Sequence, residues 1–204
     1  MTDTLSGAVL FTIAGALWAG YGAWSLKSLG EPLLGISVVL IAVTLLTAIS
    51  VLQRDVRQWP PSADKTDVRR KWVSRMFRRI NIAQGVLIFV GLQVCVNLKH
   101  PEYFPPLFVS IVGLHFIALA PVYRTYSHGV TGVLLVLLAV ATMTLVPQHL
   151  GRAGDAIGQP LWPPILGFGS AAILWASAAF RVVRSRMLLI RLAPMREMPR
   201  PNSA

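Results

Sequence analysis

Six apolar runs of about 20 residues each constrain this chain more than any other feature. They lie at about residues 5–24, 32–52, 80–98, 105–123, 130–146 and 162–183. A run of this length crosses a bilayer as one α-helix, in which the backbone polar groups find partners inside the helix. The composition agrees, because 54% of the residues are hydrophobic and 13% are charged, against about 25% charged in soluble domains. We therefore expect an all-α fold: a polytopic transmembrane bundle of six helices, in which residues 1–204 form a single integral membrane domain.

Residues 53–79 form a basic segment between the second and third runs, and this segment predicts the orientation. It carries nine of the 19 lysines and arginines. With this segment and both termini on one side, that side holds sixteen basic residues and the other side holds three. Because basic loops stay in the cytoplasm, we expect a multi-pass protein of the plasma (cytoplasmic) membrane with a cytoplasmic N-terminus and C-terminus. Topology thus explains the net charge of +11, and no nucleic acid partner is expected.

The second half of the basic segment has a helical pattern. Apolar residues recur from Val68 to Phe77 at i, i+4, i+5, i+8 and i+9, with cations between them. This pattern predicts a basic amphipathic cytoplasmic helix that lies in the headgroup plane and binds anionic lipids of the inner leaflet. Two alternatives are that the segment extends the span at 80–98 into the cytoplasm, or that it binds a partner protein. The predicted headgroup-binding residues are Arg69, Arg70, Lys71, Trp72, Arg75, Arg78 and Arg79.

Polar side chains within the spans are the next signal. With these boundaries, no Asp, Glu, Lys or Arg lies in the central part of any span, which disfavours an ion-coupled carrier. The candidates for a ligand site or polar cluster are His115, Gln84, Gln93 and Ser170. Because a buried imidazole needs partners for its donor and its acceptor, we expect His115 to form a hydrogen bond with one of the other three.

His115 and Ser170 are predicted at similar depths, which leaves an intramembrane hydrolase with a Ser-His pair as a remote alternative. Rhomboid proteases carry Gly-x-Ser-Gly ahead of the catalytic histidine, whereas Gly167-Phe168-Gly169-Ser170 follows His115. We therefore assign no catalytic residue. No cofactor or metal is expected either, since Cys95 is the only cysteine and His115 has no second histidine near the midplane.

Small residues predict where the helices touch, because they let two helix backbones approach closely. In the first run, Ala8, Thr12, Gly15, Ala19 and Gly22 fall on one helix face. In the second run, the predicted contact side holds Ser37, Thr44 and Ala48. The run at 105–123 has small residues around Gly113 on one face and His115 on another, so we expect it in the middle of the bundle.

The segment Gly113-Leu114-His115-Phe116, continued to Ala120, resembles a segment of small uncharacterised bacterial multi-pass membrane proteins. The resemblance implies a bundle of six or a similar number of spans with no assigned role. We expect a non-enzymatic accessory or interaction component of the membrane, with a second copy or another membrane protein as partner. The alternative is a passive facilitator or uncoupled carrier of a small neutral solute, for which a water-accessible cavity at the midplane would be the evidence. Residues 194–204 have the composition of a disordered tail.

Overall fold

The computed structural model describes residues 2–26, 31–57, 67–150 and 159–196. Their α-helices are α1 (Thr2–Ser25), α2 (Glu31–Arg57), α3 (Asp67–Asn97), α4 (Phe104–Tyr123), α5 (Tyr126–Leu145) and α6 (Trp162–Arg196). All six are long and apolar enough to cross a membrane. This confirms the predicted all-α bundle of six helices. A 3-10 turn, η1 (Pro101–Tyr103), precedes α4, and two short strands, β1 (His149–Leu150) and β2 (Gln159–Pro160), pair antiparallel before α6.

The turns around α4 follow from local backbone chemistry. Pro105 lies in the first turn of α4, where a backbone N–H would have no helical partner in any case. At the other end, Arg124 takes a left-handed conformation with φ 51°, and its N–H bonds back to the carbonyls of Ala120 and Pro121. This stops α4 and leaves a very short turn before α5.

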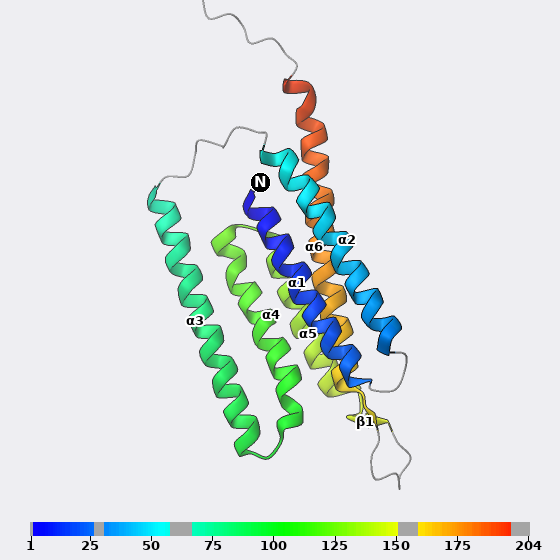
Figure 1. Ribbon diagram of the computed structural model, residues 1–204. Helices are drawn as coiled ribbons and strands as arrows, with labels where there is room; N and C mark the ends of the chain where they lie inside the picture. Colours follow the sequence, from blue (N-terminus) through cyan, green and yellow to red (C-terminus); the bar gives the residue numbers. More distant parts are fainter. Residues whose placement is uncertain (1, 27–30, 58–66, 151–158, 197–204) are drawn as a thin grey trace, which may run out of the picture.

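The helices run alternately in opposite directions (Figure 1). One end of the bundle holds the start of α1, the end of α2, the start of α3 and the end of α6, and we call it the terminal end. The other end holds β1 and β2, and we call it the hairpin end. Four helices, α1, α4, α5 and α6, form the core: α1 packs on α6, α4 on α5, and α5 also on α6.

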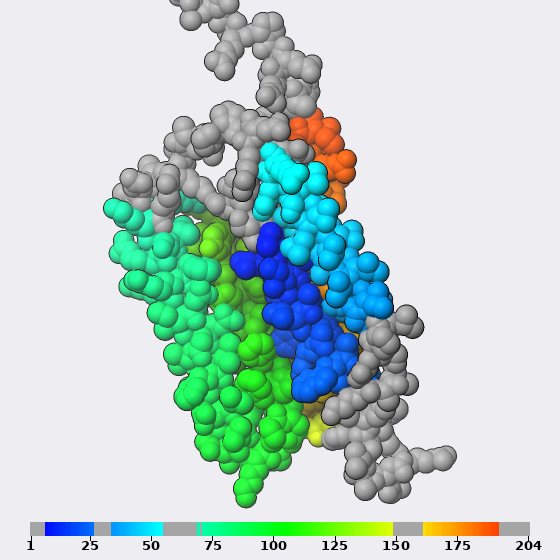
Figure 2. Space-filling view, viewed as in Figure 1, coloured from blue at the N-terminus to red at the C-terminus, as the bar shows by residue number. Residues whose placement is uncertain are grey.

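The other two helices are outer helices. α2 packs on α1 and to a lesser extent on α6, while α3 packs on α4. They lie on opposite sides of the face seen in Figure 2. α4 therefore has α3 on one side and α5 on the other, as expected for a helix with two contact faces.

Glycines let pairs of core helices approach closely. α1 and α6 cross at Gly22 and Gly167, where a Cβ atom on Gly167 would lie 2.6 Å from the Gly22 nitrogen. α4 and α5 cross in the same way at Gly113 and Gly132. The predicted stripe on α1 is buried at Ala8, Thr12, Gly15, Ala19 and Gly22, so this prediction is confirmed.

The predicted contact side of α2 is wrong. Ser37, Thr44 and Ala48 are exposed, whereas Ile49 and Leu52 are buried. The Thr44 hydroxyl donates 2.8 Å to the Leu40 carbonyl of its own helix, so it needs no neighbouring helix. A small polar residue that bonds to its own backbone gives no signal about the packing side.

The predicted surface helix is also corrected. α3 is one uninterrupted helix from Asp67 to Asn97, so its basic first half extends the span and does not lie separately in the headgroup plane. Its 31 residues make it about 46 Å long, some 16 Å more than the hydrocarbon core. The connecting residues 58–66 lie outside the described part.

α6, like α3, extends beyond its predicted span. It runs on past residue 183 to Arg196, so the first residues assigned to a disordered tail are helical. Residues 197–204 of that predicted tail lie outside the described part.

Candidate functional site

The best-defined polar site of the described residues surrounds Arg181 near the terminal end of the core. α6 turns Arg181 inward, and only 3% of this residue is exposed. Its neighbours in sequence, Arg184 and Arg186, are exposed. Arg181 lies nineteen residues after Trp162, which corresponds to about 28 Å along the helix. If Trp162 marks one boundary of the hydrocarbon core, Arg181 therefore lies at the opposite boundary.

The guanidinium of Arg181 lies between α1 and α5. Its Nη2 donates a hydrogen bond of 3.1 Å to the Ser127 hydroxyl, and its Cζ lies 4.5 Å from the centroid of the Phe11 ring. A Cβ atom on Gly7 would lie 2.6 Å from Nη1, so an alanine there would require the guanidinium to shift. The buried Nε has no hydrogen-bond partner among the described residues.

Aromatic rings of α1, α4 and α5 pack together beside the site. The Phe11 ring meets Phe116 edge-on at 4.9 Å and His128 edge-on at 5.7 Å between centroids. His128 stacks on Phe116 at 6.0 Å and also contacts Tyr123 at 5.7 Å. The His128 Nδ1 is buried and has no partner among the described residues. The Phe11 ring therefore covers the guanidinium without offering it a hydrogen-bond acceptor, and the other rings pack around Phe11.

Hydroxyl groups continue the polar site along the interface of α5 and α6. The hydroxyls of Thr131 and Ser177 are 2.7 Å apart. Ser185, one turn after Arg181, is also buried, with 3% of its surface exposed. The described site thus offers one positive charge with N–H and O–H donors, which suits an anionic oxygen ligand better than a cation.

The four predicted polar candidates do not form one hydrogen-bonded cluster. No hydrogen bond joins any two of them in the described structure. His115 is half-buried beside Phe116, at 5.7 Å between ring centroids, and its buried Nδ1 has no partner among the described residues. The hydrogen bond predicted for His115 is therefore not formed with any of the other three.

The other three candidates lie apart in the fold. Ser170 is fully buried in α6, and its hydroxyl also has no partner among the described residues. Gln84 is partly buried on α3, whereas Gln93 is exposed on the same helix. Without a bond between Ser170 and His115, the described geometry offers no assembled nucleophile and base.

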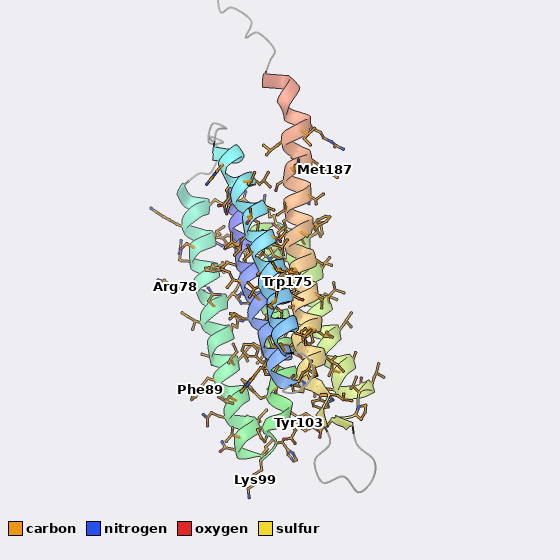
Figure 3. The ribbon with its side chains drawn as sticks, turned by 45° about the vertical axis from the view of Figure 1, so that its right-hand side comes forward. Arg78, Phe89, Lys99, Tyr103, Trp175 and Met187 are labelled. Atoms are coloured by element: carbon orange, nitrogen blue, oxygen red, sulfur yellow. The ribbon has the colours of Figure 1, made fainter. Side chains whose placement is uncertain are left out.

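The predicted headgroup-binding residues gather on the first turns of α3, near the terminal end. The side chain of Arg70 lies outside the described part. Figure 3 shows Arg78 projecting from α3 away from the other helices. On the packed side of the same turns, Phe77 meets Tyr123 of α4 at 6.3 Å between ring centroids. The exposed members of the set are Arg69, Lys71, Trp72, Arg75, Arg78 and Arg79.

An apolar groove of about 200 Å³ lies among α1, α2 and α6. None of the four predicted polar candidates lines it. The Trp175 indole, labelled in Figure 3, donates a 3.1 Å hydrogen bond to the Thr12 carbonyl. Because its lining is almost entirely apolar, the groove is unsuited to a water-filled path. Its lining residues are Ala19, Leu34, Ser37, Val38, Ile41, Phe168, Ala171, Ala172 and Trp175.

Comparison of the chain with protein-family models, curated proteins and solved structures found no match.

Proposed function

We propose that this chain is a non-enzymatic interaction component of the plasma membrane that binds a transmembrane helix of a partner through α3. The observation that carries the proposal is the exposure of Gln93 within an otherwise apolar outer face of a membrane span. The first candidate for the partner is a second copy of this chain, since two Gln93 amides related by a two-fold axis can donate to each other.

The α3 face that packs on α4 accounts for only part of the helix. Gly91 and Cys95 are buried there, and a Cβ atom on Gly91 would lie 2.8 Å from Leu107 of α4. The remaining surface is exposed, and Figure 3 shows Phe89 projecting from α3 away from the bundle. We define the outer face of α3 as the exposed residues Ile82, Gly85, Val86, Phe89, Val90 and Gln93.

An apolar face alone gives no reason for association, because lipid tails solvate it equally well. An amide is different, since an exposed glutamine in hydrocarbon gains a hydrogen bond when another helix supplies a donor or an acceptor. Gly85 shares this face, and a Cβ atom there would meet nothing within 4 Å. A partner backbone therefore has room to approach.

The proposal places the terminal end in the cytoplasm. Its support is the count of sixteen basic residues on that side against three on the other, together with the exposed cations on the first turns of α3. About 20 residues before Asn97, a span of hydrocarbon length ends near Arg78. Arg78 and Arg79 then reach the inner-leaflet phosphates, and the cations before them extend into the cytoplasm.

The carrier alternative has less support. The groove among α1, α2 and α6 is apolar, and the polar candidates of the spans are not joined by hydrogen bonds. A neutral solute needs a polar path through the bundle, and the lining of this groove offers none.

Photo-cross-linking tests the proposal in native membranes. In a Cys95→Ser background, Val90→Cys on the outer face of α3 is labelled with a benzophenone maleimide. The matched control is Val140→Cys on α5, since Val90 and Val140 are 49% and 48% exposed. We expect one discrete adduct from position 90 only, and at least about threefold less of it after Gln93→Leu.

The mass of the adduct identifies the partner. Twice the mass of the chain indicates a second copy, and another single mass indicates a different membrane protein. Equal adducts from positions 90 and 140, or an adduct that Gln93→Leu leaves unchanged, would contradict the proposal.

A further inference from the structure

Arg181 carries a charge that its described neighbours do not balance. Its neighbours are the neutral Ser127 hydroxyl at 3.1 Å and the Phe11 ring at 4.5 Å from Cζ. Among the side chains that the structure describes, no carboxylate pairs with it, and its Nε is buried without a partner. An unpaired guanidinium buried in a membrane bundle is costly, and such residues pair with a partner or serve a function.

The start of α5 adds to the positive potential at this point. Ser127 and His128 are the second and third residues of α5, and Thr125 before them makes no side-chain cap. The first turn of a helix carries a partial positive charge and free N–H groups, which attract anions. The buried guanidinium and the Ser127 hydroxyl lie 3.1 Å apart, so these two donors stand together beside the start of α5.

The depth of Arg181 in the membrane limits which anions can reach it. The Cα atom of Arg181 lies about 28 Å along α6 from that of Trp162, which is the level of the inner-leaflet headgroups in the proposed orientation. The anions available there are phosphate and carboxylate groups at the membrane surface. Arginine binds both through parallel N–H···O bonds.

We propose that Arg181, with Ser127 and the first turn of α5, binds an oxyanion at the cytoplasmic surface of the membrane. Two sources supply that chemistry. One is the phosphodiester of an anionic phospholipid of the inner leaflet. The other is a carboxylate of the chain itself: Asp3 lies four residues before Gly7 in α1, and its side chain is outside the described part.

Thermal unfolding of the full-length protein in a neutral detergent separates the two sources. Phosphatidylglycerol and phosphatidylcholine are added at equal concentrations to the wild type, Arg181→Met and Arg184→Met. Arg184 is the matched control, because it lies three residues later on α6 and is exposed. If a lipid phosphate is the ligand, phosphatidylglycerol raises the Tm of the wild type and of Arg184→Met by about 5 °C over phosphatidylcholine. Arg181→Met loses most of this rise.

If Asp3 is the source, Asp3→Asn lowers the Tm as much as Arg181→Met, and the double variant is no worse than either. Phosphatidylglycerol then acts equally on all of these proteins. If Arg181→Met does not fold, its Tm cannot be measured. The test is then the amount of phospholipid phosphorus that copurifies with the wild type. About one retained phosphate per chain supports the lipid source. The proposal is overturned if the wild type retains no phospholipid, shows no lipid-specific rise in Tm and is unaffected by Asp3→Asn.

Discussion

α1 and α2 are neighbours in sequence and in space, yet the more hydrophobic of the two is the less buried. The span of α2 has a mean hydropathy of 2.5 and 6% of its residues buried, whereas the span of α1 has 1.3 and 33%. In water this order would be reversed, because apolar surface is driven inward. In a bilayer lipid covers leucine and valine as well as protein does, so hydropathy identifies a span without identifying its neighbours.

Side-chain size explains the difference. α1 meets α6 through Gly15 and Gly22, which lie against Trp175 and Gly167. α2 presents large residues such as Leu40, of which 61% is exposed. Close backbone approach gives the core helices dispersion contacts with one another, whereas the outer helix makes most of its dispersion contacts with lipid. Each prediction below therefore compares a core position with a more exposed position, which lies on α2 in every case but one.

The largest difference is expected when a leucine is shortened. Leu166 of α6 is fully buried, whereas Leu40 of α2 is 61% exposed. Leu166→Ala leaves a cavity that helices cannot fill and should lower the free energy of unfolding by about 2–5 kcal/mol. Leu40→Ala leaves space that lipid fills, with an expected change within about 0.5 kcal/mol. Unfolding by a denaturing detergent in mixed micelles measures both, and comparable losses would show that hydropathy stabilises both helices equally.

The next difference concerns the addition of one methyl group. In Gly167→Ala the new Cβ lies 2.6 Å from the nitrogen of Gly22 and 2.8 Å from the carbonyl oxygen of Trp18. These are backbone atoms that cannot turn away, so we expect a loss of about 1–3 kcal/mol. At Gly35 of α2 a Cβ meets nothing within 4 Å, and Gly35→Ala should be neutral or stabilising by up to about 1 kcal/mol. The same unfolding measurement compares the two variants. A stabilising effect of Gly167→Ala would contradict the close crossing of α1 and α6.

Some features were readable from the sequence and others were not, for physical reasons. The spans followed from hydropathy alone, and the contact face of α1 followed from its small residues. The contact face of α2 could not be predicted in this way, because the Thr44 hydroxyl bonds to its own helix and Ala48 is tolerated equally against lipid and against protein. The burial of Arg181 was missed because it stands three residues before Arg184 and five before Arg186. Residues three apart are neighbours on a helix surface, so periodicity does not separate Arg181 from Arg184, and only the packed structure reveals that Arg181 points inward.

The continuity of α3 was misjudged for a related reason. From Val68 to Phe77 the pattern is amphipathic, and the same pattern suits a helix on a membrane surface or one that leans on a neighbouring helix. The contact between Phe77 and Tyr123 resolves the ambiguity, because it places part of the apolar side against α4. A partner helix many residues away in sequence leaves no local signal.

A smaller difference is expected for single indole hydrogen bonds. The Trp162 Nε1 donates 2.9 Å to the Val146 carbonyl and joins the start of α6 to the end of α5. Trp162→Phe should therefore cost about 1 kcal/mol. Its control is Trp24→Phe near the end of α1 that adjoins α2, where the side chain is 69% exposed and little change is expected. Equal Tm values for the two variants would show that the indole bond adds nothing to the packing of the ring.

The smallest difference concerns the Thr131 and Ser177 hydroxyls between α5 and α6. They lie 2.7 Å apart, yet Thr131 also contacts the Ser127 carbonyl at 2.7 Å and Ser177 the Ile173 carbonyl at 2.8 Å. Two hydroxyl protons cannot fully serve three contacts, so the bond between the helices competes with the bonds inside them.

We therefore expect the double-mutant cycle of Thr131→Val and Ser177→Ala to give a coupling of about 0.6 kcal/mol, the average for polar pairs in membranes. The control cycle pairs Ser177→Ala with Thr44→Val on α2, whose hydroxyl donates to Leu40 of its own helix. Its coupling should be zero within error. A coupling above about 1.7 kcal/mol for Thr131 and Ser177 would exceed the strongest such pairs. Hydrogen bonds, and not only small residues, would then distinguish the core from the outer helices.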